Sequence, residues 1–104
     1  MKRKPIVPRA VALQDVEDAL TYLLQQQANP AAVKLIDALE AAYTHISRYP
    51  ATGATRYAHA LDLPGLRAWP ITGFPYLIFY VEQDAHIDVW RVLHMSRDIP
   101  EELQ

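Results

Sequence analysis

The sequence predicts an α+β fold, in which an N-terminal strand and an antiparallel helical hairpin pack on a three- to four-stranded antiparallel sheet. Two observations predict this fold. Apolar residues in the first half of the chain recur at helical spacing, and beyond about residue 65 they recur at every second position. The connections between the later segments are also short, and short connections join antiparallel neighbours. The chain has 104 residues, so we expect a single domain over residues 1–104.

The first predicted elements are a short strand and a long helix. Residues 6–9 are a weak candidate for a strand, because Pro5 and Pro8 cannot donate hydrogen bonds to a ladder. A helix is predicted over residues 10–27, where the apolar residues fall three or four positions apart on one stripe: Leu13, Val16, Leu20, Leu23 and Leu24.

A second helix is predicted over residues 30–49. Asn29 followed by Pro30 is typical of a helix start, with asparagine as the N-cap and proline in the first turn. Pro50 disfavours helical geometry at Tyr49, which places the helix end there. The two helices with a tight link predict a hairpin. The apolar stripe of the second helix consists of Ala32, Leu35, Ile36, Leu39, Tyr43 and Ile46.

Residues 51–65 are predicted to be irregular, and three strands are predicted at 66–71, 76–82 and 87–94. Pro70 places its strand at an edge or a bulge. Alternation puts Arg67 and Trp69 on one face of their strand. On the last strand it groups Asp88, Trp90, Val92 and His94 on one face, and Ile87, Val89, Arg91 and Leu93 on the other. The predicted core consists of Leu20, Leu35, Ile36, Leu39, Ile78, Val89 and Leu93.

Composition excludes several classes of function. The chain is 51% hydrophobic and 21% charged, as in globular proteins, and it contains no cysteine, which excludes disulfides and thiolate chemistry. The apolar runs are far shorter than the ~20 residues of a membrane helix, and we expect a cytoplasmic protein. The four histidines lack metal-ligand spacing and the three glycines cannot form a phosphate loop, so neither a metal nor a cofactor is expected. The net charge of −2 argues against extensive nucleic-acid contact.

The residues most suited to recognition gather in the strand half of the chain. Arginine and tryptophan are common at interface hot spots, and histidine can act as a general acid or base. The alternative for each residue alone is a structural role, with Trp69 packed in the core and Arg97 paired with Asp98. The candidates are Arg67, Trp69, Arg91, His94 and Arg97.

Six segments occur in an order and spacing that resemble one protein family. They are DVEDALTY at 15–22, NPAA at 29–32, ISRYPATG at 46–53, LRAWPI at 66–71, FPYLIFY at 74–80 and VWRVLH at 89–94. Their succession over about residues 9–99 is similar to the RelE/ParE superfamily of type II toxins. The similarity is greater to the ParE branch, the plasmid-stabilisation toxins. The strand–helix–helix–strands fold of that family agrees with the elements predicted above.

The resemblance implies one of two activities. RelE-like members cut messenger RNA on the ribosome, and this alternative would use Arg67, Arg91 and His94 as catalytic residues. ParE-like members block DNA gyrase, which would make Arg67, Trp69, Arg91, His94 and Arg97 a target-binding surface. Met95 stands where a ribonuclease-type tyrosine is expected, and no lysine follows Lys34. We therefore favour gyrase inhibition, with growth arrest and no enzyme activity of its own, over the ribonuclease alternative.

The resemblance also implies a partner. Toxins of this superfamily are neutralised by a cognate antitoxin, here a ParD-like small DNA-binding protein. We expect its C-terminal segment to wrap the toxin as a helix or a strand. A third alternative is a non-toxic homologue that only binds the antitoxin. We expect no membrane association and no direct sequence-specific binding to nucleic acid.

Overall fold

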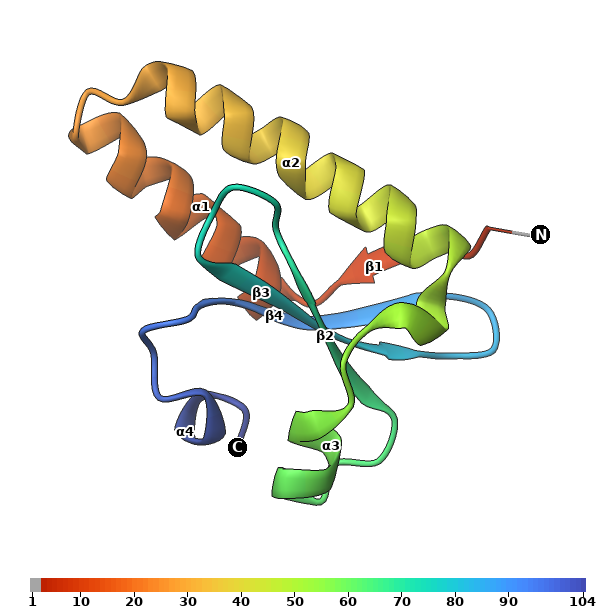
Figure 1. Cartoon of the computed structure of the whole chain (residues 1–104). Helices are drawn as coiled ribbons and strands as arrows, with labels where there is room; N and C mark the ends of the chain where they lie inside the picture. The colour runs from red at the N-terminus through yellow and green to blue at the C-terminus, as the bar shows by residue number, and fades with distance from the viewer. Residues whose placement is uncertain (1–2) are drawn as a thin grey trace.

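The computed structural model describes residues 3–104 and contains the predicted hairpin and sheet (Figure 1). Helices α1 and α2 lie against one face of the sheet, and the short helices α3 and α4 lie on its other side. None of the described helices is long and apolar enough to cross a membrane. The elements in order are β1 (Ile6–Pro8), α1 (Ala10–Gln25), α2 (Asn29–Arg48), the 3-10 turn η1 (Pro50–Thr52), α3 (Arg56–Leu61), β2 (Leu66–Pro70), β3 (Tyr76–Glu82), β4 (Ile87–His94) and α4 (Ile99–Glu102).

The sheet has the order β1-β4-β3-β2, and its two long ladders are antiparallel as predicted. Strand β1 differs, because it pairs with β4 in the parallel direction. The Ile87 N–H donates to the Pro5 carbonyl (2.8 Å), and the Arg9 N–H donates to the Val89 carbonyl (2.9 Å). The hairpin and two strands separate β1 from β4, so no short turn constrains their relative direction. Pro70 lies on the edge strand β2, one of the two places expected for it.

A β-bulge in β4 changes which residues share a face. Phe79 pairs with Arg91, but the next residue, Tyr80, pairs with Val89, so Trp90 is an extra residue. The prediction that Trp90 and Val92 share a face is therefore wrong, because the bulge shifts the alternation by one position. Val92 joins Ile87 and Val89 beneath the hairpin, whereas Trp90 packs on the opposite face with Leu93.

The bulged tryptophan is held by two charged neighbours. Its indole Nε1 donates to Asp88 Oδ2 (3.1 Å), and the Arg9 guanidinium lies 4.7 Å from its ring centre. Arg9 also donates to both carboxylate oxygens of Asp88, at 3.0 and 2.9 Å. These hydrogen bonds, which are the main cause, lower the pKa of Asp88.

Several local expectations need correction. Helix α2 starts at Asn29 itself, and Ala28 is its N-cap, so Asn29 does not cap the helix with its side chain. The stretch expected to be irregular contains η1 and α3, and α4 follows β4. Helices this short contain too few turns to reveal a hydrophobic period.

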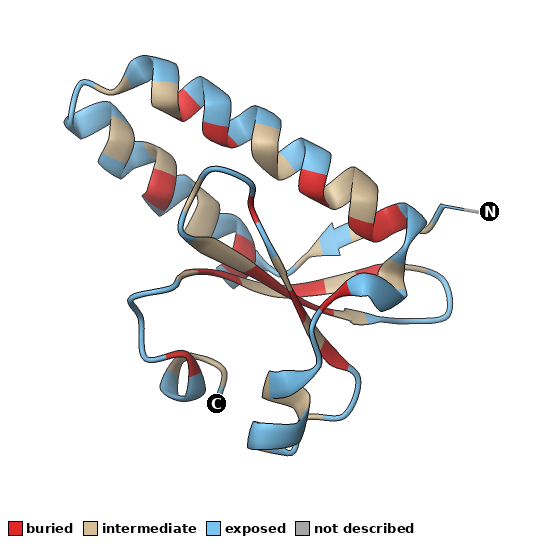
Figure 2. Ribbon diagram, viewed as in Figure 1, coloured by how far each residue is buried: buried red, intermediate tan, exposed pale blue. Residues whose placement is uncertain are grey.

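Two apolar clusters fill the molecule, one on each face of the sheet (Figure 2). Of the predicted core, Leu35, Ile78, Val89 and Leu93 are buried, and Leu20 and Leu39 are partly buried. The prediction that Ile36 belongs to the core is wrong, because Ile36 is 41% exposed. The buried side of α2 carries Ala32, Leu35, Ala42, Ile46 and Ser47, and Ile36 falls on the outer side.

Candidate functional site

The five candidate residues occupy two places separated by strand β3. Arg67 and Trp69 lie on the edge strand β2, close to the end of α2, and they share a face as predicted. Arg91 and His94 lie on β4, and Arg97 follows in the turn before α4. The structure therefore brings three of the candidates together and leaves the other two apart.

Arg67 fixes a turn after helix α2. Its Nη1 donates to the Gly53 carbonyl (2.9 Å), while the Gly53 N–H donates to the Tyr80 hydroxyl (3.1 Å). The same hydroxyl donates to the Pro50 carbonyl (2.7 Å). A Cβ at Gly53 would lie 2.5 Å from that hydroxyl, so only glycine fits. The P-x-x-G sequence at 50–53 is therefore a structural clamp, and Arg67 is part of it.

Trp69 connects the edge strand to α2 through an aromatic stack. Its ring lies on that of His45, with ring centres 4.3 Å apart and planes 13° from parallel. His45 Nε2 lies 3.0 Å from Thr52 Oγ1, and its ring is 5.3 Å from that of Tyr49. Trp69 is partly buried against the hairpin cluster, so it both packs and presents a surface.

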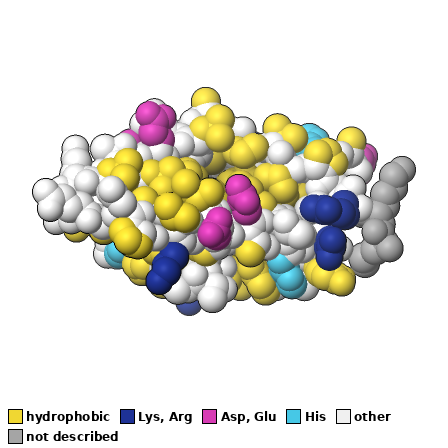
Figure 3. All heavy atoms as spheres, turned by 90° about the horizontal axis from the view of Figure 1, so that it is seen from above, with side chains coloured by type: hydrophobic (Ala, Val, Ile, Leu, Met, Phe, Trp, Pro, Cys, Tyr) yellow, Lys and Arg dark blue, Asp and Glu magenta, His cyan; other side chains and the backbone are white. Residues whose placement is uncertain are grey.

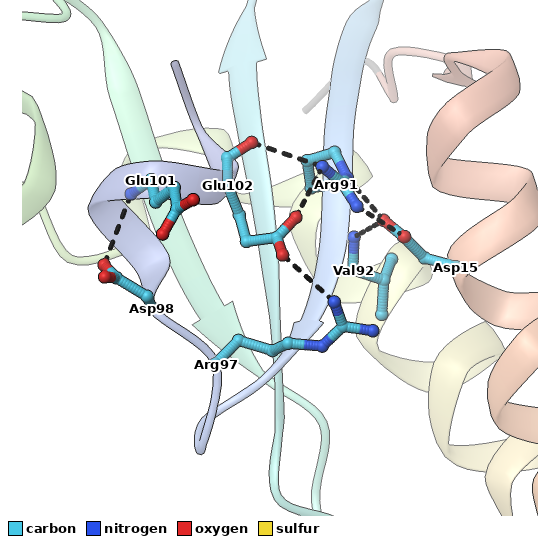
Figure 4. A network of polar contacts seen from close by, with 7 residues as sticks. All are labelled: Asp15, Arg91, Val92, Arg97, Asp98, Glu101 and Glu102. Carbon is cyan, nitrogen blue, oxygen red and sulfur yellow. Dashed lines mark hydrogen bonds and ion pairs between the residues drawn. The ribbon is translucent and has the colours of Figure 1, made fainter.

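Arg91 is held by carboxylates from two helices (Figure 4). Its Nε and Nη2 donate to the two oxygens of Asp15 on α1, both at 2.8 Å, in a bidentate pair. Its Nη1 donates to the carboxylate and the carbonyl of Glu102 on α4, both at 3.2 Å. Asp15 also accepts the Val92 N–H (3.0 Å). The hydrogen bonds to Asp15 are the main reason why the pKa of Arg91 is raised.

Arg97 and Asp98 have separate roles in the same region. The Arg97 Nη1 lies 3.0 Å from Glu102 Oε1, and the Arg97 side chain is 55% exposed. Asp98 instead accepts the Glu101 N–H (3.3 Å) as the N-cap of α4 (Figure 4). The pair expected between Arg97 and Asp98 is therefore replaced by a pair with Glu102.

His94 lies in a pocket of about 210 Å³ between α1 and the end of β4. Its Nδ1 accepts the Ser96 N–H (3.0 Å), which leaves Nε2 to carry the ring proton. The Tyr76 ring meets His94 edge to face, with centres 5.2 Å apart. Burial raises the pKa of Tyr76, and Arg97 acts against this rise. The remaining wall includes Asp15, Asp18, Tyr22 and Arg97.

Sequence reasoning missed the partners that immobilise the candidates. The pairing of Asp15 with Arg91 spans 76 positions. No local pattern signals a contact at that separation. The P-x-x-G motif was a signal for Gly53, although it did not identify Tyr80 as the partner.

The arginines of the candidate site are largely engaged in contacts within the chain. Among residues 3–104, no group of three or more histidine, aspartate or glutamate side chains is placed to hold a metal ion. Arg67 and Arg91 hold internal oxygens, and the exposed Arg97 shares a carboxylate with Arg91. The accessible part of the site is formed by aromatic and histidine rings around one arginine.

Comparison with known proteins identifies the family. Residues 6–99 match the family described as ParE toxin of type II toxin-antitoxin system, parDE. One similar solved structure is described as the chromosomal ParDE TA system from P. aeruginosa, with a TM-score of 0.72 and 14% identity. The match covers 88% of this chain and 96% of that chain. No curated protein matches the sequence. The family match extends over most of the chain and agrees with the fold, so this chain belongs to the ParE toxin family of type II toxin-antitoxin systems.

Proposed function

We propose that this chain is a toxin that arrests growth by binding DNA gyrase in the cytoplasm and that a cognate antitoxin neutralises it. Family membership supports the toxin role. The observation that supports binding over RNA cleavage is that two arginines of the site, Arg67 and Arg91, donate hydrogen bonds to oxygens of the chain itself. Arg91 makes a bidentate pair with Asp15, and Arg67 clamps the Gly53 carbonyl.

Cleavage of RNA would need these groups for a different purpose. A phosphorane carries concentrated negative charge, and enzymes stabilise it with preorganised donors aimed at its oxygens. Here the donors of Arg91 point at Asp15 and Glu102, so they are already occupied. Inhibition by binding needs only a fixed surface with a few exposed anchors.

Within the candidate set, we assign two roles. Trp69, His94 and Arg97 contact the target: Trp69 and His94 are partly exposed ring systems, and the Arg97 side chain is 55% exposed against 17% for Arg91. Arg67 and Arg91 support that surface by holding the turn at 50–53 and the junction of α1, β4 and α4.

The antitoxin has a suitable surface on the outer side of the hairpin. Figure 3 views the molecule from this side and shows hydrophobic side chains over much of the face, with acidic side chains among them. Apolar patches rimmed by polar groups mark sites of protein association. The exposed apolar residues of α1 and α2 include Leu13, Leu24, Val33 and Ile36, and the exposed acids of these helices include Glu17, Asp37 and Glu40.

Two assays with the purified toxin test the proposal. We expect inhibition of supercoiling by gyrase, and no cleavage of ribosome-bound messages at the same concentration. His94→Gln separates the mechanisms, because loss of a general acid or base costs ~10²–10⁴-fold in activity, whereas loss of a contact residue costs a few-fold in affinity. Unchanged supercoiling together with His94-dependent cleavage of messages would overturn the gyrase proposal.

A further inference from the structure

The pocket beside His94 has the size of a site for one side chain. Its volume of about 210 Å³ lies below the ~300–1,000 Å³ of sites that enclose small-molecule ligands. Asp15, Asp18, Ala19 and Tyr22 form its wall on α1, where spacings of three and four residues place them on one helix face. Tyr76 and the end of β4 form the opposite wall.

The charges around the pocket do not balance. Asp15, Asp18 and Glu102 supply three negative charges, whereas Arg91 and Arg97 supply two positive charges. Asp15 and Glu102 are occupied by the two arginines. The uncompensated carboxylate is that of Asp18, whose Oδ1 accepts only the neutral amide of Gln14 (2.8 Å), and no lysine or arginine of residues 3–104 pairs with it.

Two tyrosines in the pocket wall also favour the binding of a cation. Tyr22 and Tyr76 both line the pocket, and the Tyr22 side chain is 60% exposed. An aromatic face attracts a guanidinium or ammonium group, and the attraction strengthens when the cation leaves water. A carboxylate beside two aromatic rings is thus better matched to a basic side chain than to an anion.

We propose that this pocket receives a lysine or arginine side chain of the antitoxin as an anchor. The inference rests on the proposed function, because it presumes that an antitoxin binds. The toxin is acidic overall, with a net charge of −2, which favours a basic partner segment. A chain anchored there would cover His94 and Arg97, so it would neutralise the toxin by blocking its target-binding surface.

The test is a binding experiment with the antitoxin encoded beside the toxin. Calorimetry measures the affinity of wild-type toxin, Asp18→Asn, Tyr22→Leu and the control Asp84→Asn, an exposed acid in the turn between β3 and β4 and outside the pocket. We expect Asp18→Asn and Tyr22→Leu to weaken binding on the order of tenfold. Asp84→Asn should change it less than about twofold. Equal melting temperatures establish that the variants are folded.

Replacing each lysine and arginine of the antitoxin with methionine identifies the anchor. One replacement should weaken binding to the wild-type toxin about tenfold and have little further effect on Asp18→Asn, as expected for a coupled pair. The anchor proposal is wrong if every replacement affects both toxins equally, or if Asp18→Asn binds the antitoxin as tightly as the wild type. Either result would leave the proposed neutralisation by an antitoxin intact.

Two other outcomes separate this inference from the proposed function. An Asp18→Asn toxin that keeps its antitoxin affinity but loses gyrase inhibition would assign the pocket to the target and overturn the anchor. If wild-type toxin forms no complex with the antitoxin at all, both the anchor and the proposed neutralisation fail.

Discussion

Single side chains in this toxin show how burial changes the chemistry of a common group. The Tyr80 hydroxyl lies between the Pro50 carbonyl and the Gly53 N–H, so it acts as a structural crosslink. Tyr43, on α2, packs against the cluster of buried residues between the hairpin and the sheet. Burial first, and the Asp15 carboxylate second, raise the pKa of Tyr43 to about 12. Both environments stabilise the neutral phenol over the phenolate.

The first prediction concerns alkaline unfolding. The pKa of Tyr43 rises from 10.0 to about 12 on folding, so its contribution to stability is complete below pH 10. That contribution disappears as the pH rises towards 12, with a loss of about 2–3 kcal/mol at 1.36 kcal/mol for each pH unit. We expect Tyr43→Phe to unfold less steeply with pH in urea titrations. Equal pH slopes for the variant and the wild type over this range would contradict the assignment.

At the scale of secondary structure, the elements that carry a clear hydrophobic period could be predicted from the sequence. Features without such a period, such as the bulge and the direction of β1, could not. The helices at 10–25 and 29–48 and the three later strands carry clear repeats, and every predicted end of these elements lies within two residues of the observed end. The bulge at Trp90 interrupts a repeat that continues on both sides, and nothing in the local sequence marks it. The parallel direction of β1 depends on its partner β4, far along the chain.

The second prediction compares two neighbouring positions on α2. Leu35 is 2% exposed and Ile36 is 41% exposed, although both lie on the apolar stripe read from the sequence. Leu35→Ala should lower the free energy of unfolding by ~2–5 kcal/mol, because it leaves a cavity under the hairpin. Ile36→Ala should cost less than about 1 kcal/mol. Urea unfolding of the two variants measures both values, and equal losses would mean that α2 faces the sheet differently.

For the whole molecule, the Asp15–Arg91–Glu102 network connects its separate parts. Arg91 of β4 pairs with Asp15 in the hairpin and with Glu102 in α4, on opposite sides of the sheet (Figure 4). The candidate site was predicted as a set of residue types, and the strand half does hold them. Their roles could not be predicted, because they depend on pairing between distant segments. Arginine at position 91 suggested contact with the target, and in the structure its guanidinium joins β4 to α1 and α4.

The third prediction separates support from contact by comparing two arginines of this network. The Arg91 side chain is 17% exposed and that of Asp15 11%, so Arg91→Met leaves a nearly buried carboxylate unpaired and should cost about 3 kcal/mol of stability. The Arg97 side chain is 55% exposed, and Arg97→Met should cost under about 1 kcal/mol. Urea unfolding measures both losses.

Gyrase inhibition, expressed per folded molecule, should show the opposite order. We expect Arg91→Met to inhibit gyrase like the wild type once its unfolded fraction is subtracted. The guanidinium of Arg91 in the wild type donates its hydrogen bonds to Asp15 and Glu102, so it is not available to contact a partner. Arg97→Met should lose a few-fold in inhibition while it stays folded. Adding Asp15→Asn to Arg91→Met removes the unpaired charge and should restore part of the lost stability. Loss of inhibition in a fully folded Arg91→Met protein would instead place Arg91 in contact with the target.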